Sequence, residues 1–327
     1  MLNYIIRRCL MAIPLLIAIS IVTFVVIKLP PGSYLETYIA QQQRQGGQVT
    51  KDRVEAIKQR YGLGQPTYIQ YFKWISGFPR GDFGMSFKAQ QPVSKIIKER
   101  IGFTILLSLA TVLFTWSLAV PIGIYSAVRQ YSVFDYIFTF IGFIGVAIPN
   151  FLLALFLMFI GIKFFGTDLS GLFSMEYMGE PWSLGKVIDM LKHLWVPVIV
   201  VGTGGMAGLI RIMRGQMLDE LRKAYVQTAR AKGLSEYIVI VKHVARIAIN
   251  PFVSTIGWML PGLISGGTLA GIVLGLPTLG PKLLDALKTQ DMYLAGTIMM
   301  LLSSLTIIGT LISDILLAIV DPRIRYE

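Results

Sequence analysis

Long apolar runs dominate the hydrophobic pattern of this chain. A helix needs about 20 apolar residues to cross the hydrocarbon core of a bilayer. Five runs carry no charged side chain, and a sixth carries only Asp314. The six runs cover residues 9–27, 101–128, 137–162, 194–210, 251–281 and 293–320. The pattern therefore predicts an all-α polytopic membrane protein with six transmembrane helices.

The composition agrees with this prediction, since 54% of the residues are hydrophobic and only 15% are charged. Soluble domains carry about 25% charged residues. The first run follows Arg7 and Arg8, but no Ala-x-Ala cleavage pattern comes after it. We therefore expect residues 1–28 to stay as a transmembrane helix and not to be removed as a signal peptide.

The distribution of Lys and Arg predicts the orientation in the membrane. With a cytoplasmic N-terminus, the inner segments hold thirteen basic residues and the short outer segments hold five. Basic residues in short loops favour the cytoplasmic side. We therefore expect both termini in the cytoplasm, and we attribute the net charge of +12 to topology and not to nucleic-acid binding.

Residues 29–100 form the long polar segment after the first run, and we expect them outside the cytoplasm. Residues 50–62 carry the spacing of a helix. A set of aromatic side chains follows, which we expect at the membrane interface. These are Tyr68, Tyr71, Phe72 and Trp74. The remaining residues, 101–327, are predicted to form a core of five transmembrane helices.

Prolines interrupt the apolar runs at Pro121, Pro149 and Pro261. A proline in a membrane helix frees a backbone carbonyl, which must be satisfied by a neighbouring helix or by water in a cavity. A kinked, packed helix and a helix that lines a pathway both fit this pattern.

The sequence GTGGMAG at residues 202–208 matches the pattern of a dinucleotide-binding loop. It lies within an apolar run, however, so it favours close packing between helices.

Chemistry for catalysis or metal binding is absent from the motifs. The chain has one cysteine, Cys9, and two histidines, His193 and His243, which the topology separates. It has no P-loop sequence, so ATP is not expected to bind to this chain. Asp314 is the one acid in a span, where it is either an interfacial partner of Arg7, Arg323 or Arg325 or an ion-coupling site. No catalytic residue, metal site or cofactor is predicted.

The polar segment of residues 211–250 predicts two helices that meet at a corner. Residues 216–232 lack Gly and Pro and predict one helix. Gly233 suits the left-handed position that ends a helix, and Ser235 with Glu236 suits the start of the next one. Small residues before the corner would let another protein approach. The corner is predicted either to dock on a partner or to rest on the lipid surface.

The sequence YVQTARAKGLSEYIVIVKHVARIAINPF at residues 225–252 resembles the cytoplasmic coupling loop of ABC importer permeases, in the form of the dipeptide, oligopeptide and nickel permease family. Further stretches in the same order extend the resemblance over nearly the whole chain. They include YIIRRCLMAIPLLI, RYGLGQPTYIQYFKWISGFPRGDFGMSF, PVSKIIKERIGFTILLSLA, AVPIGIYSAVRQ, LGLPTLG and DPRIRY.

The resemblance implies a type I importer fold in a prokaryotic inner membrane. It implies a second permease subunit, two ATP-binding subunits that hold ATP and Mg²⁺, and an extracytoplasmic substrate-binding protein; membrane lipid surrounds the assembly. It also implies that residues 211–250 form the coupling loop. The residues expected to contact the ATPase are Tyr225, Thr228, Ala229, Ala231, Lys232, Gly233, Leu234 and Ser235.

Breakers and small residues in the spans are the candidates for the translocation pathway and its gate. They are Pro149, Asn150, Pro261, Gly266, Gly267, Gly271 and Pro277. Two positions depart from the family pattern: Ala224 and Gly271 stand where relatives usually carry acids. Asp219, Glu220 and Glu236 are the candidates to replace the acid missing at Ala224.

The substrate class follows from the resemblance only. Di- and oligopeptides are the first expectation, with oligosaccharides, nickel or another solute as alternatives on the same machinery. A stand-alone channel or an ion-coupled carrier is the alternative of another class. In every case the chain is predicted to be a transport protein and not an enzyme.

Overall fold

The computed structural model describes residues 2–29 and 64–320, together with residues 39, 54, 55 and 59. All regular elements of these residues are helices, apart from one isolated β-bridge between Met85 and Pro92. Most of the helix predicted for residues 50–62 lies outside the described residues. Contacts divide the chain into two compact units, which are described separately below. The topological division at residues 28 and 100 stays a prediction.

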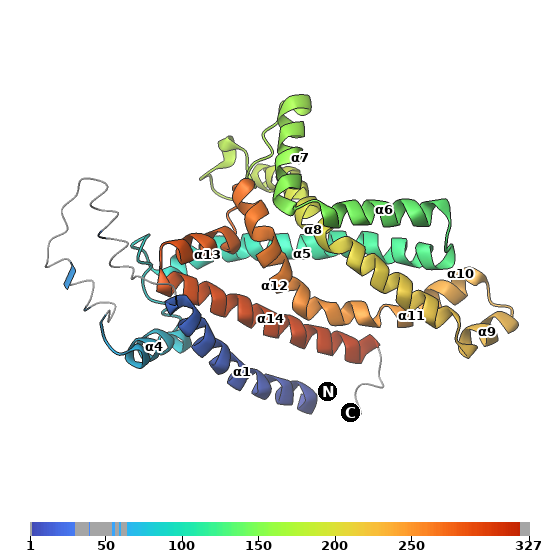
Figure 1. Ribbon diagram of the computed structural model, residues 1–327, viewed down its shortest axis with the longest axis horizontal. Helices are drawn as coiled ribbons and strands as arrows, with labels where there is room; N and C mark the ends of the chain where they lie inside the picture. The colour runs from blue at the N-terminus through green and yellow to red at the C-terminus, as the bar shows by residue number, and fades with distance from the viewer. Residues whose placement is uncertain (1, 30–38, 40–53, 56–58, 60–63, 321–327) are drawn as a thin grey trace. The chain divides into compact units, whose positions relative to one another are not determined.

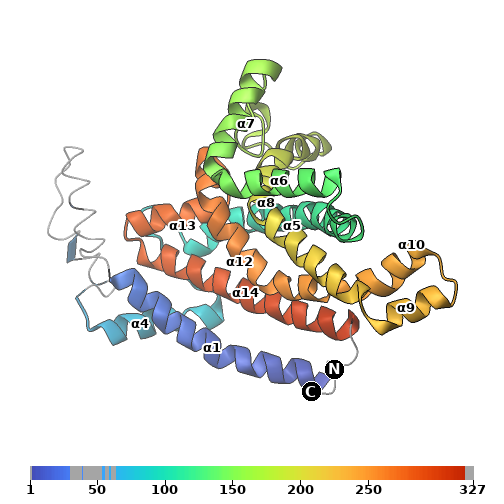
Figure 2. The same cartoon turned by 45° about the vertical axis from the view of Figure 1, so that its right-hand side comes forward.

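One unit consists of residues 6–102 and 278–305. It contains most of α1 (Leu2–Lys28), α4 (Thr67–Ile75), the short helix η1 (Phe78–Arg80), the first part of α5 (Val93–Val128), α13 (Leu279–Lys288) and the first part of α14 (Met292–Val320). In both views α1 lies beside this part of α14 (Figure 1 and Figure 2). Its core is built around Trp74, Phe87, Leu279 and Ile298, all nearly or fully buried.

The aromatic residues of α4 divide between core and surface. Trp74 is only 2% exposed, and its ring lies 5.7 Å from that of Phe24 in α1. Tyr71 shares a hydrogen bond of 2.7 Å with the Ser20 hydroxyl. Tyr68 and Phe72 remain exposed. Trp74 thus packs into the core of this unit, and the expected position of the four aromatic residues at the membrane interface stays a prediction.

The start of α14 is fixed by a buried carboxylate. Asp291 is fully buried and accepts hydrogen bonds from the Ser86 hydroxyl at 2.5 Å, the Lys88 backbone N–H and the Leu294 backbone N–H. It therefore caps α14 and holds the turn of residues 84–92 against that helix. Gly84 lies against the Tyr293 ring, where a Cβ atom would come within 2.3 Å of a ring carbon.

The other unit contains residues 103–277 and the end of α14. It holds the rest of α5, then α6 (Val133–Ala147), α7 (Asn150–Phe165), the short helix η2 (Met175–Tyr177), α8 (Leu184–Leu221), α9 (Ala224–Ala231), α10 (Glu236–Ile238), the π-helical turn η3 (Val239–Val244), α11 (Ala245–Ala248) and α12 (Asn250–Val273). The long helix α8 packs against α6, α7 and α12.

The small residues of α8 let its neighbours approach closely. A Cβ atom on Gly202 would come within 2.9 Å of the Phe114 ring in α5, and one on Gly204 within 2.9 Å of the Asn150 side chain in α7. Ala207 faces Gly142 of α6. The interpretation of residues 202–208 as a helix-packing sequence is therefore confirmed.

The apolar run of residues 137–162 is not one straight helix. It is divided into α6 and α7, which meet at an angle of 101°. Ile148 leaves the helical conformation before Pro149, as expected of a residue that precedes proline, and Pro149 then caps α7. The interruption expected at Pro149 is therefore confirmed, and it is a break between two helices and not a kink within one helix.

Five helical segments of the described residues are long and apolar enough to cross a membrane, and the bent pair of α6 and α7 raises the number to six. Four of the five lie in α1, α5, α8 and α14, and the fifth is the segment Glu236–Thr255. The predicted run of residues 251–281 also ends earlier than expected, since α12 stops at Val273 and a turn with a left-handed Gly275 leads to α13.

Candidate functional site

The corner predicted from the polar segment projects from the end of α8. Figure 1 and Figure 2 both show α9 and α10 beyond the last turn of α8, away from α7. The chain leaves α8 at Leu221, turns back after α9, and continues through α10, η3 and α11 into α12. The corner is therefore connected at one end to α8 and at the other to α12, both of which pack in the body of this unit.

A bend at Arg222 and Lys223 separates α8 from α9. The single helix predicted for residues 216–232 was therefore wrong. The physical reason is the Glu220 carboxylate, which is 8% exposed and accepts hydrogen bonds from Lys223 Nζ at 2.5 Å and from the Tyr225 hydroxyl at 2.8 Å. These bonds hold Lys223 in an extended conformation, so the chain turns before α9 begins.

Tyr225 is half-buried at this bend. Burial raises the pKa of its hydroxyl well above the ordinary value, and the hydrogen bond to the Glu220 carboxylate raises it further. The hydroxyl therefore stays protonated and serves as a hydrogen-bond donor at any physiological pH.

The end of α9 has the backbone geometry predicted from Gly233. This residue has a φ of +74°, in the left-handed region. Its N–H donates to the Arg230 carbonyl at 2.9 Å, and the Leu234 N–H donates to the Ala229 carbonyl at 3.4 Å. This pair of bonds is the Schellman motif, which satisfies the carbonyls that a helix leaves unpaired at its end.

The contacts that stabilise the start of α10 differ from those that we predicted. Ser235 occupies the N-cap position, but its side chain makes no capping hydrogen bond. Instead, Glu236 pairs with Arg230 through two bonds, from Nε at 3.1 Å and from Nη2 at 2.5 Å. The Arg230 guanidinium lowers the pKa of Glu236 through these hydrogen bonds. A two-point ion pair thus joins the two sides of the corner.

The inner face of the corner is apolar. Val226 and Ala229 of α9 and Val239 and Val244 of η3 are buried in one cluster. The small side chain of Ala229 therefore allows α9 to pack within the corner. It is not on the outer surface, where we had expected it to meet a partner.

Most of the remaining predicted contact residues form the outer face of the corner. Those exposed to solvent are Thr228, Ala231, Lys232, Gly233, Leu234 and Ser235. Together they make a small, mixed surface at the tip of a well-supported turn. Such a surface fits docking into a partner's cleft, because little order is lost on binding.

The acid that we expected at position 224, where the chain has Ala224, has no simple replacement. Glu220 and Glu236 are both engaged within the corner, with Tyr225 and Arg230 respectively. Asp219 is exposed and makes no ion pair with any described residue. Of the three candidates, Asp219 is therefore the one with a carboxylate available to a partner. Glu220 and Arg230 are supporting residues whose pairing the sequence pattern did not reveal, since both pairs cross a helix end.

The candidate pathway residues are spread over several elements. Pro149 and Asn150 lie at the α6–α7 bend, with the Asn150 side chain against Gly204. Gly267 faces Val201 of α8, and Gly271 is buried. Pro261 and Gly266 lie within α12, and Pro277 lies after the end of that helix. Their assignment to a pathway or gate stays a prediction.

Among the described residues, no group of three or more His, Cys, Asp or Glu side chains could hold a metal ion. Asp314 is half-buried in α14. Two of its expected partners, Arg323 and Arg325, lie outside the described residues.

The chain is similar to known proteins over its full length. Residues 119–326 match the family described as binding-protein-dependent transport system inner membrane component, and residues 1–110 match the N-terminal family of the same membrane components. The oligopeptide transport system permease protein AppB of Bacillus subtilis is 37% identical over 327 residues, which cover 99% of each chain.

Two further relatives extend this similarity to other bacteria. The dipeptide transport system permease protein DppB of Escherichia coli K12 is 30% identical over 343 aligned residues, and the alignment covers all of both chains. The oligopeptide transport system permease protein OppB of Haemophilus influenzae is 32% identical, also over the full length of both chains.

Proposed function

Because this chain belongs to the family of binding-protein-dependent transport system inner-membrane components, we propose that it forms half of the pathway of an ATP-driven importer for di- and oligopeptides. Members of this family are multi-pass inner-membrane transport subunits and not enzymes. Such a system implies an ATPase, a binding protein and a partner permease.

The peptide substrate is supported by the names of the relatives. AppB and OppB are named for oligopeptides and DppB for dipeptides. None of these relatives is named for oligosaccharides or nickel, so we do not propose these alternatives. Family membership likewise argues against a stand-alone channel or an ion-coupled carrier.

The projecting corner carries the proposal for energy coupling. It offers an exposed tip of small and polar residues, supported by the Schellman motif at Gly233, the Arg230–Glu236 pair and the Glu220 network. We propose that ATPase subunits, which hold ATP and Mg²⁺, receive this tip. Because the corner is joined to α8 and α12, its movement would carry both helices as rigid bodies and open the pathway to one side or the other.

The orientation is part of the proposal. The excess of basic residues in the inner segments supports a cytoplasmic position for both termini and for the corner. The extracytoplasmic face would then receive peptide from the binding protein. We propose that the bend at Pro149 and the glycines of α12 lie along the pathway, because breaks and small residues allow helices to rearrange.

The docking proposal is tested by adding bulk and charge at the tip. Ala231→Arg places a long cation on an exposed position of α9 without entering the buried cluster. We expect about tenfold less ATPase subunit to co-purify with the tagged permease, as a mismatched charge at an interface centre costs well over 1 kcal/mol. Peptide-stimulated ATP hydrolysis in proteoliposomes should fall in parallel.

The matched control is Gln130→Arg, which adds the same charge in the connection between α5 and α6. It should leave co-purification and ATP hydrolysis unchanged. Undiminished ATPase recovery with Ala231→Arg would show that this tip is not the docking surface.

A further inference from the structure

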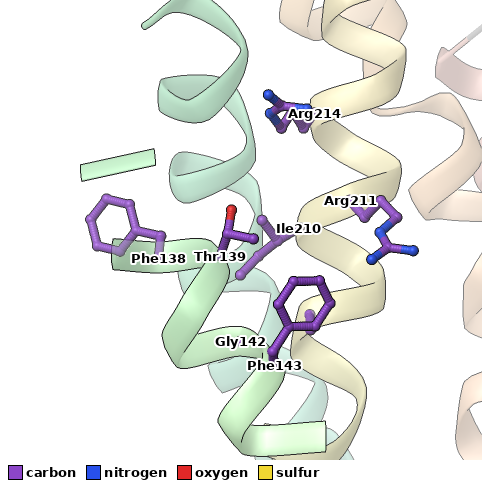
Figure 3. Close-up of a pocket in the computed structure, with 8 residues that line it drawn as sticks. Phe138, Thr139, Gly142, Phe143, Ile210, Arg211 and Arg214 are labelled. Carbon is purple, nitrogen blue, oxygen red and sulfur yellow. The ribbon is translucent and has the colours of Figure 1, made fainter. Parts of the chain in front are cut away.

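A groove between α6 and α8 is not explained by the transport function. It encloses a cavity of about 220 Å³, smaller than the roughly 300 Å³ at which small-molecule sites begin. Gly142 and Ala207 form its narrow floor, and Phe138 and Phe143 supply aromatic walls. Figure 3 shows Thr139 and Phe143 on α6 with Ile210 between the two helices. The cavity thus fits a small group with apolar surroundings.

Two arginines of α8, Arg211 and Arg214, are among the residues that line the groove, and their side chains leave the helix in different directions (Figure 3). The Arg211 guanidinium lies 5.6 Å from the centre of the Phe143 ring and is otherwise exposed. Arg214 donates from Nη2 to the buried Asp135 carboxylate at 3.2 Å. The groove lining thus has two guanidinium groups, and the single carboxylate of Asp135 pairs with one of them, so the lining carries a net positive charge.

The arginines also have unused hydrogen-bonding capacity. The Nε of Arg214 is buried and has no hydrogen-bond partner among the described residues. A guanidinium has five N–H donors, and an Arg214 that spends one on Asp135 keeps several for another acceptor. Asp135 already accepts from the Tyr131 backbone N–H, although its Oδ1 atom is also unpartnered. The Arg214 side chain is partly exposed, so an anionic oxygen group in the groove could accept from the guanidinium N–H groups that remain accessible.

The depth of this site in the membrane follows from the sequence of α8. Arg211 comes directly after the apolar run of residues 194–210, so it lies where the hydrocarbon region ends. The Arg214–Asp135 pair places the polar start of α6 at the same level. Below this level both helices are apolar, and exposed side chains such as Ile141 and Phe143 face the surroundings.

We propose that the α6–α8 groove binds the headgroup of an anionic phospholipid. The phosphate would pair with Arg211 and Arg214, and the acyl chains would lie along the apolar surface of α6. Guanidinium groups match phosphate oxygens in pairs, and basic pockets between transmembrane helices at the membrane interface suit anionic headgroups. A free anion would gain nothing from the aromatic walls, so the groove favours the lipid over inorganic phosphate.

The test is native mass spectrometry of the assembled importer, purified from nanodiscs that contain equal amounts of phosphatidylglycerol and phosphatidylcholine. We expect retained phosphatidylglycerol with the unmodified chain and about a tenfold loss with the double variant R211Q/R214Q, because this variant removes the charge-assisted hydrogen bonds to the phosphate. R129Q removes an arginine from the α5–α6 connection, outside the groove, and should retain the lipid. Inorganic phosphate should not displace it.

A second variant keeps both arginines and fills the cavity. T139W should also reduce retained phosphatidylglycerol, while phosphatidylcholine stays low throughout. Equal retention in R211Q/R214Q and the unmodified chain would overturn the proposal, as would displacement by inorganic phosphate. A photo-reactive side chain at position 139 that labels the second permease subunit instead of lipid would show that protein covers the groove, and would also overturn it.

Discussion

At the scale of single residues, the corner depends on Gly233. Its left-handed backbone permits the two hydrogen bonds that end α9. A side chain at this position costs about 1 kcal/mol, because Cβ approaches the following carbonyl. The sequence predicted this position, since the requirement is local to the glycine and its neighbours.

We predict that Gly233→Ala increases amide hydrogen exchange in residues 224–238 about fivefold, the change that corresponds to about 1 kcal/mol. The matched control is Gly215→Ala in α8, where the glycine is helical and a Cβ atom has nothing within 4 Å. That variant should keep or slow the exchange of the corner, because alanine favours a helix. Equal effects of the two variants would contradict the role of the left-handed residue.

Glu220 is the second residue on which the corner depends. We predict that Glu220→Ala destabilises the bend by about 1–3 kcal/mol, because the Tyr225 hydroxyl and the Lys223 ammonium lose a buried acceptor. Glu220→Gln keeps an acceptor for Tyr225 and should recover part of the loss. The measurement is hydrogen exchange of α9, and the control is Asp219→Ala at the exposed neighbouring position. Equal protection in Glu220→Ala and Asp219→Ala would count against the bend network.

The ion pair across the corner predicts a response to pH. Arg230 holds the pKa of Glu236 below its ordinary value of about 4.3. A lowered pKa in the folded state means that the pair stabilises the corner above the ordinary pKa, and that this contribution is lost as the pH falls through the lowered pKa. The pair is therefore complete at neutral pH.

This response is measured with a fluorophore attached to Lys232→Cys in a Cys9→Ser background. Cys9 is the single native cysteine, so its replacement leaves position 232 as the one site of labelling. The anisotropy should stay constant from pH 8 to pH 5 and fall below the ordinary pKa, about 4.3. With Arg230→Ala the step should move up to the ordinary value or vanish. A step at the same pH in both proteins would rule out control by Arg230.

At the scale of elements, the sequence predicted apolar helices well and their bends poorly. Pro149 was visible as a breaker within residues 137–162, but the 101° angle between α6 and α7 depends on packing that no local pattern contains. The same applies to Trp74, whose burial depends on Phe24 in α1 and on the lack of a side chain at Gly296 of α14. Contacts between residues far apart in the chain decided both cases.

Asp291 is another element-scale contact that the sequence did not reveal. We predict that Asp291→Ala destabilises its unit by about 2–3 kcal/mol, because the Ser86 hydroxyl and two backbone N–H groups lose a buried acceptor. Faster hydrogen exchange in residues 84–92 would report this change.

The control for Asp291 is the nearby Asp285, which pairs with Lys88 at the surface. Asp285→Ala should cost less than about 1 kcal/mol, as exposed ion pairs usually do. If Asp285→Ala lowered the stability as much as Asp291→Ala, the stabilising role of the buried Asp291 carboxylate would be disproved.

At the scale of the whole molecule, the sequence carried most of the functional conclusion. The apolar runs, the loop charges and the ordered motifs identified a permease, because transmembrane segments and family motifs are each recognised from residues that are close together in the sequence. The contacts that stabilise the corner were only partly predicted: the left-handed position of Gly233 was found, but the Glu220 and Arg230 pairs needed the folded geometry. Ala229 is buried within the corner, which the small-residue pattern did not reveal.

The central claim is that the exposed tip of the corner contacts an ATPase subunit, and cysteine cross-linking in the assembled importer tests it most directly. In a Cys9→Ser background, Lys232→Cys should form a cross-link to the ATPase with a short bifunctional reagent. Thr289→Cys, at the end of α13 in a segment predicted to face outward, should form none. A cross-link from Thr289→Cys but not from Lys232→Cys, or none from either in an active importer, would contradict the account.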